Sequence, residues 1–273
     1  MIFKMVQLKN KNVLIISTSG IFKDKASFFL LIEFICGISI VIYTSLWLID
    51  YLLQGFWILW LLVPLSVYSC LYLFTFSITF IAFLLLRLVN KVYPPKEGIF
   101  ERNSKDWKFW RYRYWITYLP LWSVRALPLP WLDIAVYRIF GVKLGRNVCI
   151  YDGWVDPEFI TIGDHTMTSL NTIIHSHLIY NDKLIIKRVE IGRNCIIGPQ
   201  TIVSPGTTLE EGTILGANSI TKIGQALEGG KIHIGVPVSK SFPIMSIEET
   251  ENKLTRLGVE QYKKKKPQKG KNQ

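Results

Sequence analysis

Two long apolar runs occupy the first third of the chain. In Ala26–Ile49 the only charged residue is Glu33, and in Tyr51–Leu86 there is none. A helix needs about 20 mostly apolar residues to cross a bilayer, so each run is long enough. Neither run keeps the polar face that a helix of a soluble core would show. The pattern predicts a two-helix transmembrane hairpin within residues 26–90, connected by Asp50–Gly55.

Two residues in these runs add to the picture. As a single helix, the second run would be about 54 Å long, so it is expected to tilt, project from the bilayer or bend at Pro64. Glu33 is costly in a bilayer unless it faces another helix or water. A position near the cytoplasmic interface is the other interpretation of Glu33.

The second half of the chain repeats with a period of six from Leu144 onward. In Ile191–Ile220 each block of six begins with Ile, Val or Leu and has a small residue in fifth place. Helical faces recur near 3.6 residues and strand faces at 2, so neither fits. A period of six is typical of a β-helix, whose inward aliphatic residues stack about 4.8 Å apart. The small residues are expected at the narrow corners: Cys195, Thr201, Thr207, Thr213 and Ser219.

The solenoid is expected over residues 142–240, with two irregularities. Trp154 and Asp156 break the pattern, which predicts a local bulge or a shifted turn at that point. Leu178–Glu190 interrupts the repeat as an insertion. The segment Ile232–Lys240 is expected to leave the last coil.

The segments on either side of the solenoid differ in composition. Residues 91–141 mix Trp and Tyr with Arg and Lys, which predicts an interfacial segment at lipid headgroups. The apolar runs upstream favour lipid over nucleic acid as its partner. In residues 241–273, Ser246–Gly258 is predicted to form a short helix with a Ser N-cap, followed by a disordered basic tail.

The net charge is +12, and the positions of the cations predict the topology. Residues 1–25 are basic, the connection between the apolar runs has no cation, and Arg87, Lys91 and Lys96 follow the second run. The positive-inside rule then places both termini and the β-helix domain in the cytoplasm, in a multi-pass protein of the cell membrane. The four cysteines form no CxxC pair and are expected to be reduced packing residues.

Several stretches resemble the hexapeptide-repeat acyltransferases, the left-handed parallel β-helix family. The family pattern is carried by "DPEFITIGDHT" (Asp156–Thr166), "IIGPQTIVSPGTTLEEGTILGANSITK" (Ile196–Lys222) and "GVPVSK" (Gly235–Lys240). The chain is most similar to the membrane-embedded C-terminal region of polylysine-synthetase-type peptide synthetases. That likeness extends to "FWRYRYW", "YRIFGVKLGRNV" and "NTIIHSHLIYNDK".

The resemblance implies acyl transfer from coenzyme A to a hydroxyl or amine in a homotrimer, with the site between subunits and one His as base. His177 occupies that place, at the end of a coil just before the insertion. A His that titrates near 6.5 can take a proton from a hydroxyl as it attacks the thioester. A third group should orient the imidazole, and the candidates are Asn171 and Asp182.

Donor-binding residues are also implied. An oxyanion needs a backbone N–H donor, and because Pro199 has none, Gly198 is the nearest candidate. The pantetheine arm of coenzyme A is expected near Gly216 and Ala217. Its phosphates are expected at exposed cations: Lys222, Lys240, Lys187 and Arg188.

Two other functions stay open. His175 shares a strand face with His177, and with His165 or His233 it could form a metal site, as in the γ-class carbonic anhydrases of the same fold. A non-catalytic trimeric scaffold is the second alternative. The favoured function is a membrane-anchored O- or N-acyltransferase that uses acyl-CoA, with acetyl as the expected group and no metal. Its acceptor is expected to be membrane-associated or lipid-linked.

Overall fold

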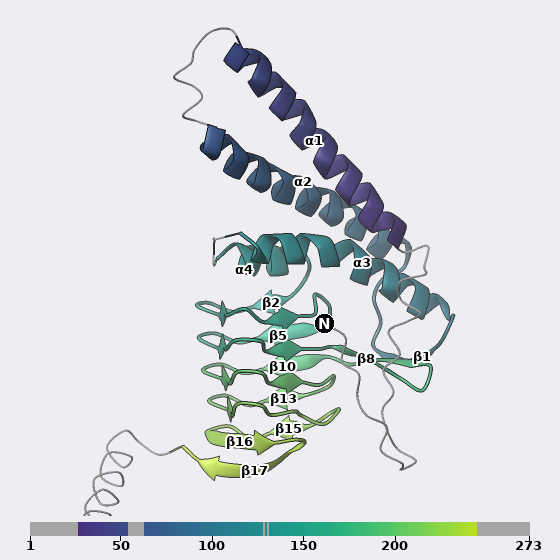
Figure 1. The fold of residues 1–273 in the computed structure, drawn as a ribbon. Coiled ribbons are helices and arrows are strands. Elements are labelled where there is room, and N and C mark those ends of the chain that lie inside the picture. The colour runs from purple at the N-terminus through teal and green to yellow at the C-terminus, as the bar shows by residue number, and fades with distance from the viewer. Residues whose placement is uncertain (1–26, 54–62, 128, 130, 245–273) are drawn as a thin grey trace, which may run out of the picture.

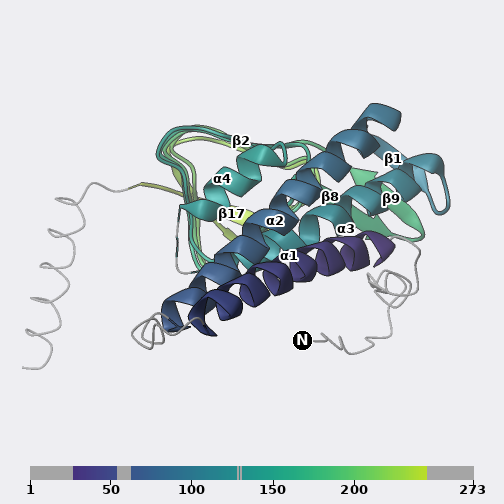
Figure 2. The ribbon, with the colours of Figure 1, turned by 90° about the horizontal axis from the view of Figure 1, so that it is seen from above.

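The computed structural model describes residues 27–53, 63–127, 129 and 131–244. Two long helices stand above a stack of short strands, and two further helices lie between these parts (Figure 1). Figure 2 looks down on the stack, where the coils overlie one another and the helices cross their top. The basic N-terminus, the C-terminal helix and the tail that the sequence predicts lie outside the described residues.

The two apolar runs form helices α1 (Ser27–Leu53) and α2 (Val63–Val92), which pack against each other. Both are long and apolar enough to cross a membrane, over Phe28–Tyr51 and Val67–Val92, and only a small share of each stretch is buried within the protein. The composition that predicted two spans is therefore matched by two helices of sufficient length.

The predicted ends of these helices need correction. Helix α1 does not stop before Asp50 but continues to Leu53, since one aspartate among apolar residues does not break a helix. Pro64 lies in the first turn of α2 rather than at a bend in its middle. A proline is tolerated in that turn because its missing N–H would have no helical acceptor.

Helices α1 and α2 approach closely at Gly37. A Cβ atom there would lie 2.7 Å from Cγ2 of Ile78, so the contact requires glycine. One turn away, Glu33 is fully buried, and neither of its carboxylate oxygens has a hydrogen-bond partner among the described residues. Glu33 is therefore enclosed by the protein, and its position relative to a bilayer stays a prediction.

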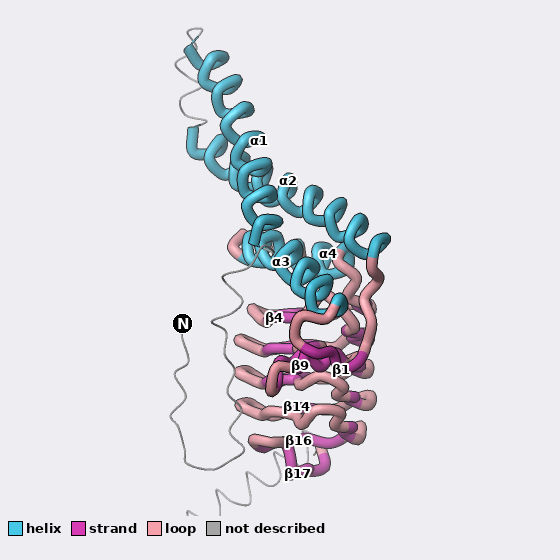
Figure 3. The backbone as a smooth tube through the Cα atoms, turned by 90° about the vertical axis from the view of Figure 1, so that its right-hand side faces the viewer, coloured by secondary structure: helices cyan, strands magenta, loops and turns pink. Residues whose placement is uncertain are grey.

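The connector forms strand β1 (Gly98–Glu101), helix α3 (Lys105–Arg125) and helix α4 (Leu132–Ile139). Ser104 caps α3 by accepting a hydrogen bond from the backbone N–H of Trp107 at 3.2 Å. Both helices lie across the upper end of the solenoid (Figure 3).

The aromatic residues of the connector do not all face outward. Trp107, Trp110 and Trp115 are buried in the protein, because they form the face of α3 that packs on its neighbours. The prediction of an interfacial segment is therefore wrong for these three rings. Trp122 and Trp131 are exposed, by 60% and 62%, and remain available to a membrane surface.

Below the helices the chain winds into a parallel β-helix with three faces (Figure 3). Most pairing partners lie 18 residues apart, as in Cys149 and Met167, and those on either side of the insertion lie 29 apart, as in Met167 and Ile196. The polar face contains β2 (Lys143–Leu144), β5 (Ile160–Ile162), β10 (Val189–Ile191), β13 (Thr208–Leu209) and β15 (Ala226–Leu227). The long apolar face contains β3 (Cys149–Ile150), β6 (Met167–Thr168), β11 (Ile196–Ile197), β14 (Ile214–Leu215), β16 (Lys231–Gly235) and β17 (Val238–Pro243). The short apolar face contains β4 (Trp154–Val155), β7 (Ile173–Ile174) and β12 (Ile202–Val203).

The core of the solenoid is the one that the six-residue period predicts. The aliphatic residues that open the clean blocks are buried: Ile191, Ile197, Val203, Leu209 and Leu215. The predicted corner residues, Cys195, Thr201, Thr207, Thr213 and Ser219, are completely buried. The threonine hydroxyls donate to backbone carbonyls at the corners, for example Thr201 to Gly216 at 3.0 Å, so the narrow corners leave no unpaired polar group there.

The predicted irregularity near Trp154 is a one-residue shift in register. Strand β4 pairs with β7 so that Val155 lies opposite Ile174. A strict 18-residue period would instead place Asp156 opposite Ile174 and into the core. Val155 takes the inward position, with 1% exposure, and Asp156 falls one residue beyond it.

The insertion is a β-hairpin, β8 (His177–Tyr180) and β9 (Lys183–Ile186), which the connector strand β1 extends to three strands. The coil also continues further than predicted. His233 pairs in parallel with Leu215 and is 5% exposed, so the chain leaves the solenoid only after this residue. The repeat was not recognised here because His233, a polar residue, occupies an inward position where an aliphatic residue was expected.

Candidate active site

A buried carboxylate and two imidazoles meet at the corner that follows the short apolar face. Oδ2 of Asp156 lies 2.5 Å from Nδ1 of His177 and 3.4 Å from Nδ1 of His175. The same oxygen accepts the backbone N–H of Ser176 at 2.9 Å. Oδ1 accepts the indole N–H of Trp154 at 3.1 Å. Both oxygens of this carboxylate are therefore engaged, one of them by the imidazoles.

The register shift in β4 builds this arrangement. Because Val155 takes the inward position, Asp156 follows it at the corner, level with His175 in the next coil. Its backbone N–H donates to Ile174 at 3.0 Å, which keeps the residue in the parallel ladder. The break in the repeat is thus the feature that brings the carboxylate to the imidazoles.

Helix α3 covers the imidazole of His177. The ring centroids of Trp110 and Tyr114 lie 4.8 Å and 5.8 Å from that of His177. The side chain of His177 is 16% exposed and that of His175 34%, so neither ring extends into bulk water. The site has an aromatic wall on one side and the solenoid corner on the other.

A second charged pair lies beside this cluster. Nε of Arg113, from α3, donates to Oε1 of Glu158, and Nη1 donates to the carbonyl of Tyr93 at 3.3 Å. Burial raises the pKa of Glu158, against the opposing effect of Arg113. Tyr93 directly follows α2, so the pair connects the apolar hairpin to the turn after Asp156.

The protonation states follow from these contacts. Burial would raise the pKa of Asp156, but the imidazoles of His177 and His175 outweigh burial and hold that pKa well below its usual value. Burial lowers and Asp156 raises the pKa of His175, and the net shift is upward. An ionised carboxylate only accepts hydrogen bonds, so Nδ1 of His177 carries a hydrogen, and in the neutral imidazole the lone pair is on Nε2. Such a His is oriented as a general base.

Neither predicted orienting residue is beside the imidazole. Asp182 lies at the tip of the β8–β9 hairpin, where its carboxylate pairs with Arg102 at 2.8 Å. Asn171 is exposed in a turn, and its backbone N–H donates to Asp152. The structure assigns the position to Asp156, and the break in the six-residue pattern was its signal in the sequence.

The predicted donor residues lie at another corner. Gly198, Gly216 and Ala217 lie together between the long and short apolar faces, where a Cβ on Gly198 would be 2.7 Å from the backbone nitrogen of Ala217. Within one protomer the short apolar face separates them from His177. The N–H of Gly198 donates to Leu215 at 2.8 Å, so this predicted oxyanion donor is already occupied.

The predicted phosphate-binding cations divide into two groups. Lys187 and Lys222 are exposed on the corner that carries the imidazoles, with the turn at Ser204–Gly206 between them. Lys240 is exposed on β17, at the far end of the solenoid. Arg188 is held by Glu97 at 3.0 Å, so it is not a free cation.

The cluster is also the group that could hold a metal ion. The candidate ligand atoms of Asp156, His175 and His177 all lie within 4.8 Å of one another. His165 is in an exposed turn and His233 is buried in the last coil, so neither joins them. The sequence analysis considered another His as the third ligand, whereas the group beside His175 and His177 is the carboxylate of Asp156.

Comparisons with known proteins agree with this architecture. Residues 186–222 match the family described as bacterial transferase hexapeptide (six repeats). No curated protein sequence matches the chain. The repeat match and the strand pairing agree with a parallel β-helix of the hexapeptide-repeat type.

Solved structures similar to this chain include three that are described as acetyltransferases. A maltose O-acetyltransferase from Clostridium difficile 630 is 18% identical over 44% of this chain and 78% of its own, with a TM-score of 0.38. A hexapeptide-repeat acetyltransferase from Vibrio cholerae is 16% identical over 46% and 86%, with a TM-score of 0.37. A galactoside acetyltransferase in complex with coenzyme A is 17% identical over 56% and 89%, with a TM-score of 0.40. At these TM-scores the likenesses define neither substrate nor site residues, and the resemblance to polylysine-synthetase-type enzymes stays a prediction.

Proposed function

We propose that this protein is a membrane-anchored O- or N-acyltransferase that uses acyl-CoA, with acetyl as the expected group. The observation that carries the proposal is the hydrogen bond between buried Asp156 and His177. It leaves Nε2 of His177 as a proton acceptor in a partly buried site. The match to a repeat of bacterial transferases supports the same reaction.

The proposed reaction needs no covalent enzyme intermediate. Nε2 of His177 takes the proton of the acceptor hydroxyl or amine as that group attacks the thioester carbonyl carbon. A C–O or C–N bond forms, the C–S bond then breaks, and the imidazolium returns its proton to the leaving thiolate. Asp156 stabilises the imidazolium through Nδ1–H. Since Pro199 has no N–H and that of Gly198 is bound to Leu215, the oxyanion donor is another group.

A homotrimer would complete this site. The outward positions of two faces are apolar, which is typical of surfaces that meet another protein. If copies meet there, the corner of Gly198, Gly216 and Ala217 can face His177 of a neighbour, and coenzyme A can lie between them toward Lys222 or Lys240. The apolar positions are Cys149, Met167, Ile196, Ile214 and Ile232 on the long face, and Trp154, Ile173, Ile202 and Ile220 on the short face. On the third face, the polar one, the outward residues are Lys143, Thr161, Glu190, Thr208 and Ala226.

The acceptor that fits this architecture is membrane-associated or lipid-linked. Helix α3 packs against α1 and α2 and also covers His177, so the site lies close to the hairpin. The cations that flank the apolar helices support a cytoplasmic solenoid. An acceptor held at the inner membrane surface would then reach the imidazole without crossing the bilayer.

The test is a thiol-release assay on the full-length protein in detergent, with acetyl-CoA and a membrane lipid extract as acceptor. His177→Ala should lower turnover by roughly 10²–10⁴-fold, as expected for loss of a general base. The matched control is His165→Ala, because His165 is an exposed His outside the cluster and should leave turnover unchanged. Equal rates for His177→Ala and wild type would exclude the proposed base. Absence of thiol release with any acceptor would favour the scaffold alternative.

A metal enzyme is the second candidate, and the close grouping of Asp156, His175 and His177 favours it. A zinc site needs three protein ligands and an open position. Elemental analysis of the purified protein distinguishes the two functions. If the wild-type protein holds stoichiometric zinc and the His175→Ala variant does not, the site is a metal centre and His177 is not a general base.

A further inference from the structure

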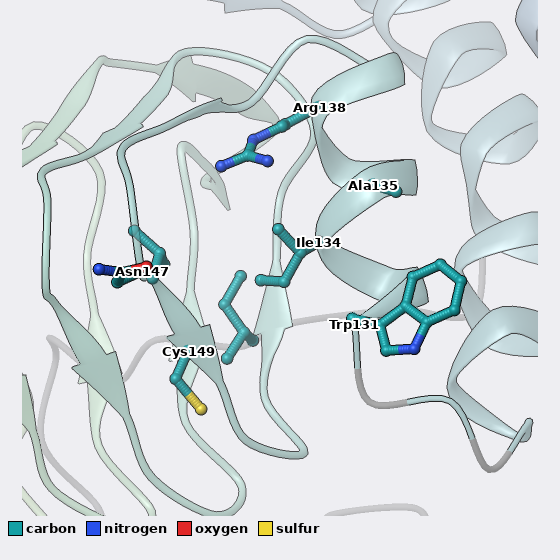
Figure 4. A pocket seen from close by; sticks show the side chains of 8 residues that line it. Trp131, Ile134, Ala135, Arg138, Asn147 and Cys149 are labelled. Atoms are coloured by element: carbon teal, nitrogen blue, oxygen red, sulfur yellow. The ribbon is translucent and has the colours of Figure 1, made fainter.

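A pocket lies on the opposite side of the solenoid from the imidazoles, between α4 and the first coil. Its volume is about 500 Å³, within the range of roughly 300–1,000 Å³ of small-ligand pockets. Trp131, Ile134 and Val148 give it an apolar lining, and Arg138 and Cys149 also line it. Figure 4 shows Ile134 and Arg138 extending from α4 toward the strand that carries Cys149, with Trp131 at the other end of the helix.

The pocket combines an apolar surface with one cation. Nη2 of Arg138 donates to the carbonyls of Gly145 at 2.8 Å and Leu144 at 3.5 Å, which holds the guanidinium beside the first coil. Its Nε and Nη1 have no hydrogen-bond partner among the described residues. A fixed guanidinium with free N–H groups suits a phosphate. The ligand it fits therefore has an apolar part and a phosphate.

The position of the pocket indicates where such a ligand comes from. Trp131 and Ile139 of α4 are exposed by 62% and 47%, and Trp122 at the end of α3 by 60%. Exposed tryptophans beside cations are typical of the headgroup region of a membrane. Helix α4 also shares one hydrophobic core with Ala82 and Leu86 of α2, so this surface is continuous with the apolar hairpin.

We propose that the pocket binds an acyl chain of an anionic phospholipid, with the lipid phosphate at Arg138. This inference rests on the proposed membrane anchoring but on no step of the acyl transfer. A bound lipid would hold the upper end of the solenoid against the membrane surface. The proton acceptor and thiol release described above would be unaffected if the pocket proved empty.

Cys149 provides a direct probe of occupancy. It is the only exposed cysteine of the four, since Cys195 is buried and Cys36 and Cys70 are partly buried in the apolar helices. The full-length protein in dodecyl maltoside is alkylated with a soluble maleimide, with added phosphatidylglycerol or phosphatidylcholine. Since only the open pocket reacts, phosphatidylglycerol at about ten times its Kd should slow alkylation roughly 10-fold. Phosphatidylcholine should protect less.

Two variants test the two parts of the pocket. Arg138→Ala should raise the Kd for phosphatidylglycerol about 10-fold, as expected for a lost hydrogen bond to a charged group, so the same lipid concentration should slow alkylation only about 2-fold. Ala135→Trp fills the apolar part and should abolish protection without removing the cation. Lys143→Ala, an exposed cation on the polar face of the same coil, is the matched control and should keep full protection.

Three outcomes would overturn the proposal. Equal protection by phosphatidylglycerol and phosphatidylcholine would show that the pocket does not recognise the negative charge of the lipid through Arg138. Protection by glycerol 3-phosphate alone would indicate a soluble phosphate ligand rather than a lipid. Cys149 is also an outward residue of the long apolar face proposed to meet another copy, so protection that rises with protein concentration and ignores lipid would assign the pocket to that contact instead of to a lipid. Each variant is compared with and without lipid, so a change in the intrinsic reactivity of Cys149 does not affect the result.

Discussion

Replacing Asp156 by Asn tests whether the carboxylate orients the base. Asp156 accepts hydrogen bonds from His177, from Ser176 and from Trp154, through both of its oxygens. An amide has one accepting oxygen, so its NH₂ group must face either the imidazole or the indole. Facing the imidazole, it reverses the tautomer and protonates Nε2. Facing the indole, the NH₂ group would meet the indole N–H of Trp154, so that two donors face each other without an acceptor.

The expected cost follows from those contacts. Turnover in the thiol-release assay should fall about 10²–10⁴-fold, because the base is lost or misoriented. The free energy of unfolding should fall by about 1–3 kcal/mol, since a buried donor is left unpaired. Both quantities are measured on the same preparation, by assay at saturating acetyl-CoA and by thermal denaturation in detergent.

The control for this variant is Asp152→Asn. Asp152 is also on the first coil, but it is 58% exposed and paired with Arg125 at 2.7 Å. An exposed pair contributes about 0–1 kcal/mol, so turnover should change less than about 2-fold. Wild-type turnover by a folded Asp156→Asn protein would refute the reasoning. A loss of turnover in both variants would indicate that the substitutions disturb the structure of the first coil and not the orientation of the imidazole.

Two further predictions concern the buried charges around the site. Arg113→Met should destabilise the protein by about 3–5 kcal/mol, because it leaves Glu158 buried without its partner; adding Glu158→Gln should recover most of that loss in thermal denaturation, and a double variant no more stable than the single one would contradict the pairing. His175 has a raised pKa in the folded state, so its contribution to stability is complete below its unfolded pKa of about 6.5 and is lost as pH rises through the folded pKa. His175→Asn should therefore flatten the decline in stability between pH 6 and pH 9, His165→Asn should not, and an unchanged slope in His175→Asn would exclude this linkage.

The solenoid was predictable because its physics is local and periodic. Each block needs one aliphatic residue inward and one small residue at the corner. The sequence of Ile191–Ile220 meets both requirements in every block and therefore predicts the fold. The same count fails where a polar residue occupies an inward position, as Thr221 and His233 do. The apolar helices were predictable for a similar reason, since length and hydropathy alone identify them.

The candidate site was only partly predictable, because its contacts join distant segments. His177 could be found before the insertion, but its partner Asp156 lies 21 residues earlier, across a coil. The aromatic wall comes from Trp110 and Tyr114, in a helix that composition alone assigned to the membrane surface. No periodicity in either segment encodes such contacts. A charged residue at a core position of a repeat was the one local signal, and it marked the site.

The position of α3 determines how the acceptor should be tested. Because Trp110, Arg113 and Tyr114 lie before the predicted solenoid boundary at residue 142, a detached solenoid would lose the wall and the ion pair beside His177. It would also expose the core that α4 shares with the first coil, where Val136 and Tyr137 pack with Ile150 and Val155. Weak activity of such a fragment would therefore say nothing about the natural acceptor. The informative comparison keeps the full chain and varies the bilayer: a lipid-linked acceptor should turn over faster in nanodiscs than in detergent, whereas a soluble acceptor should show no difference.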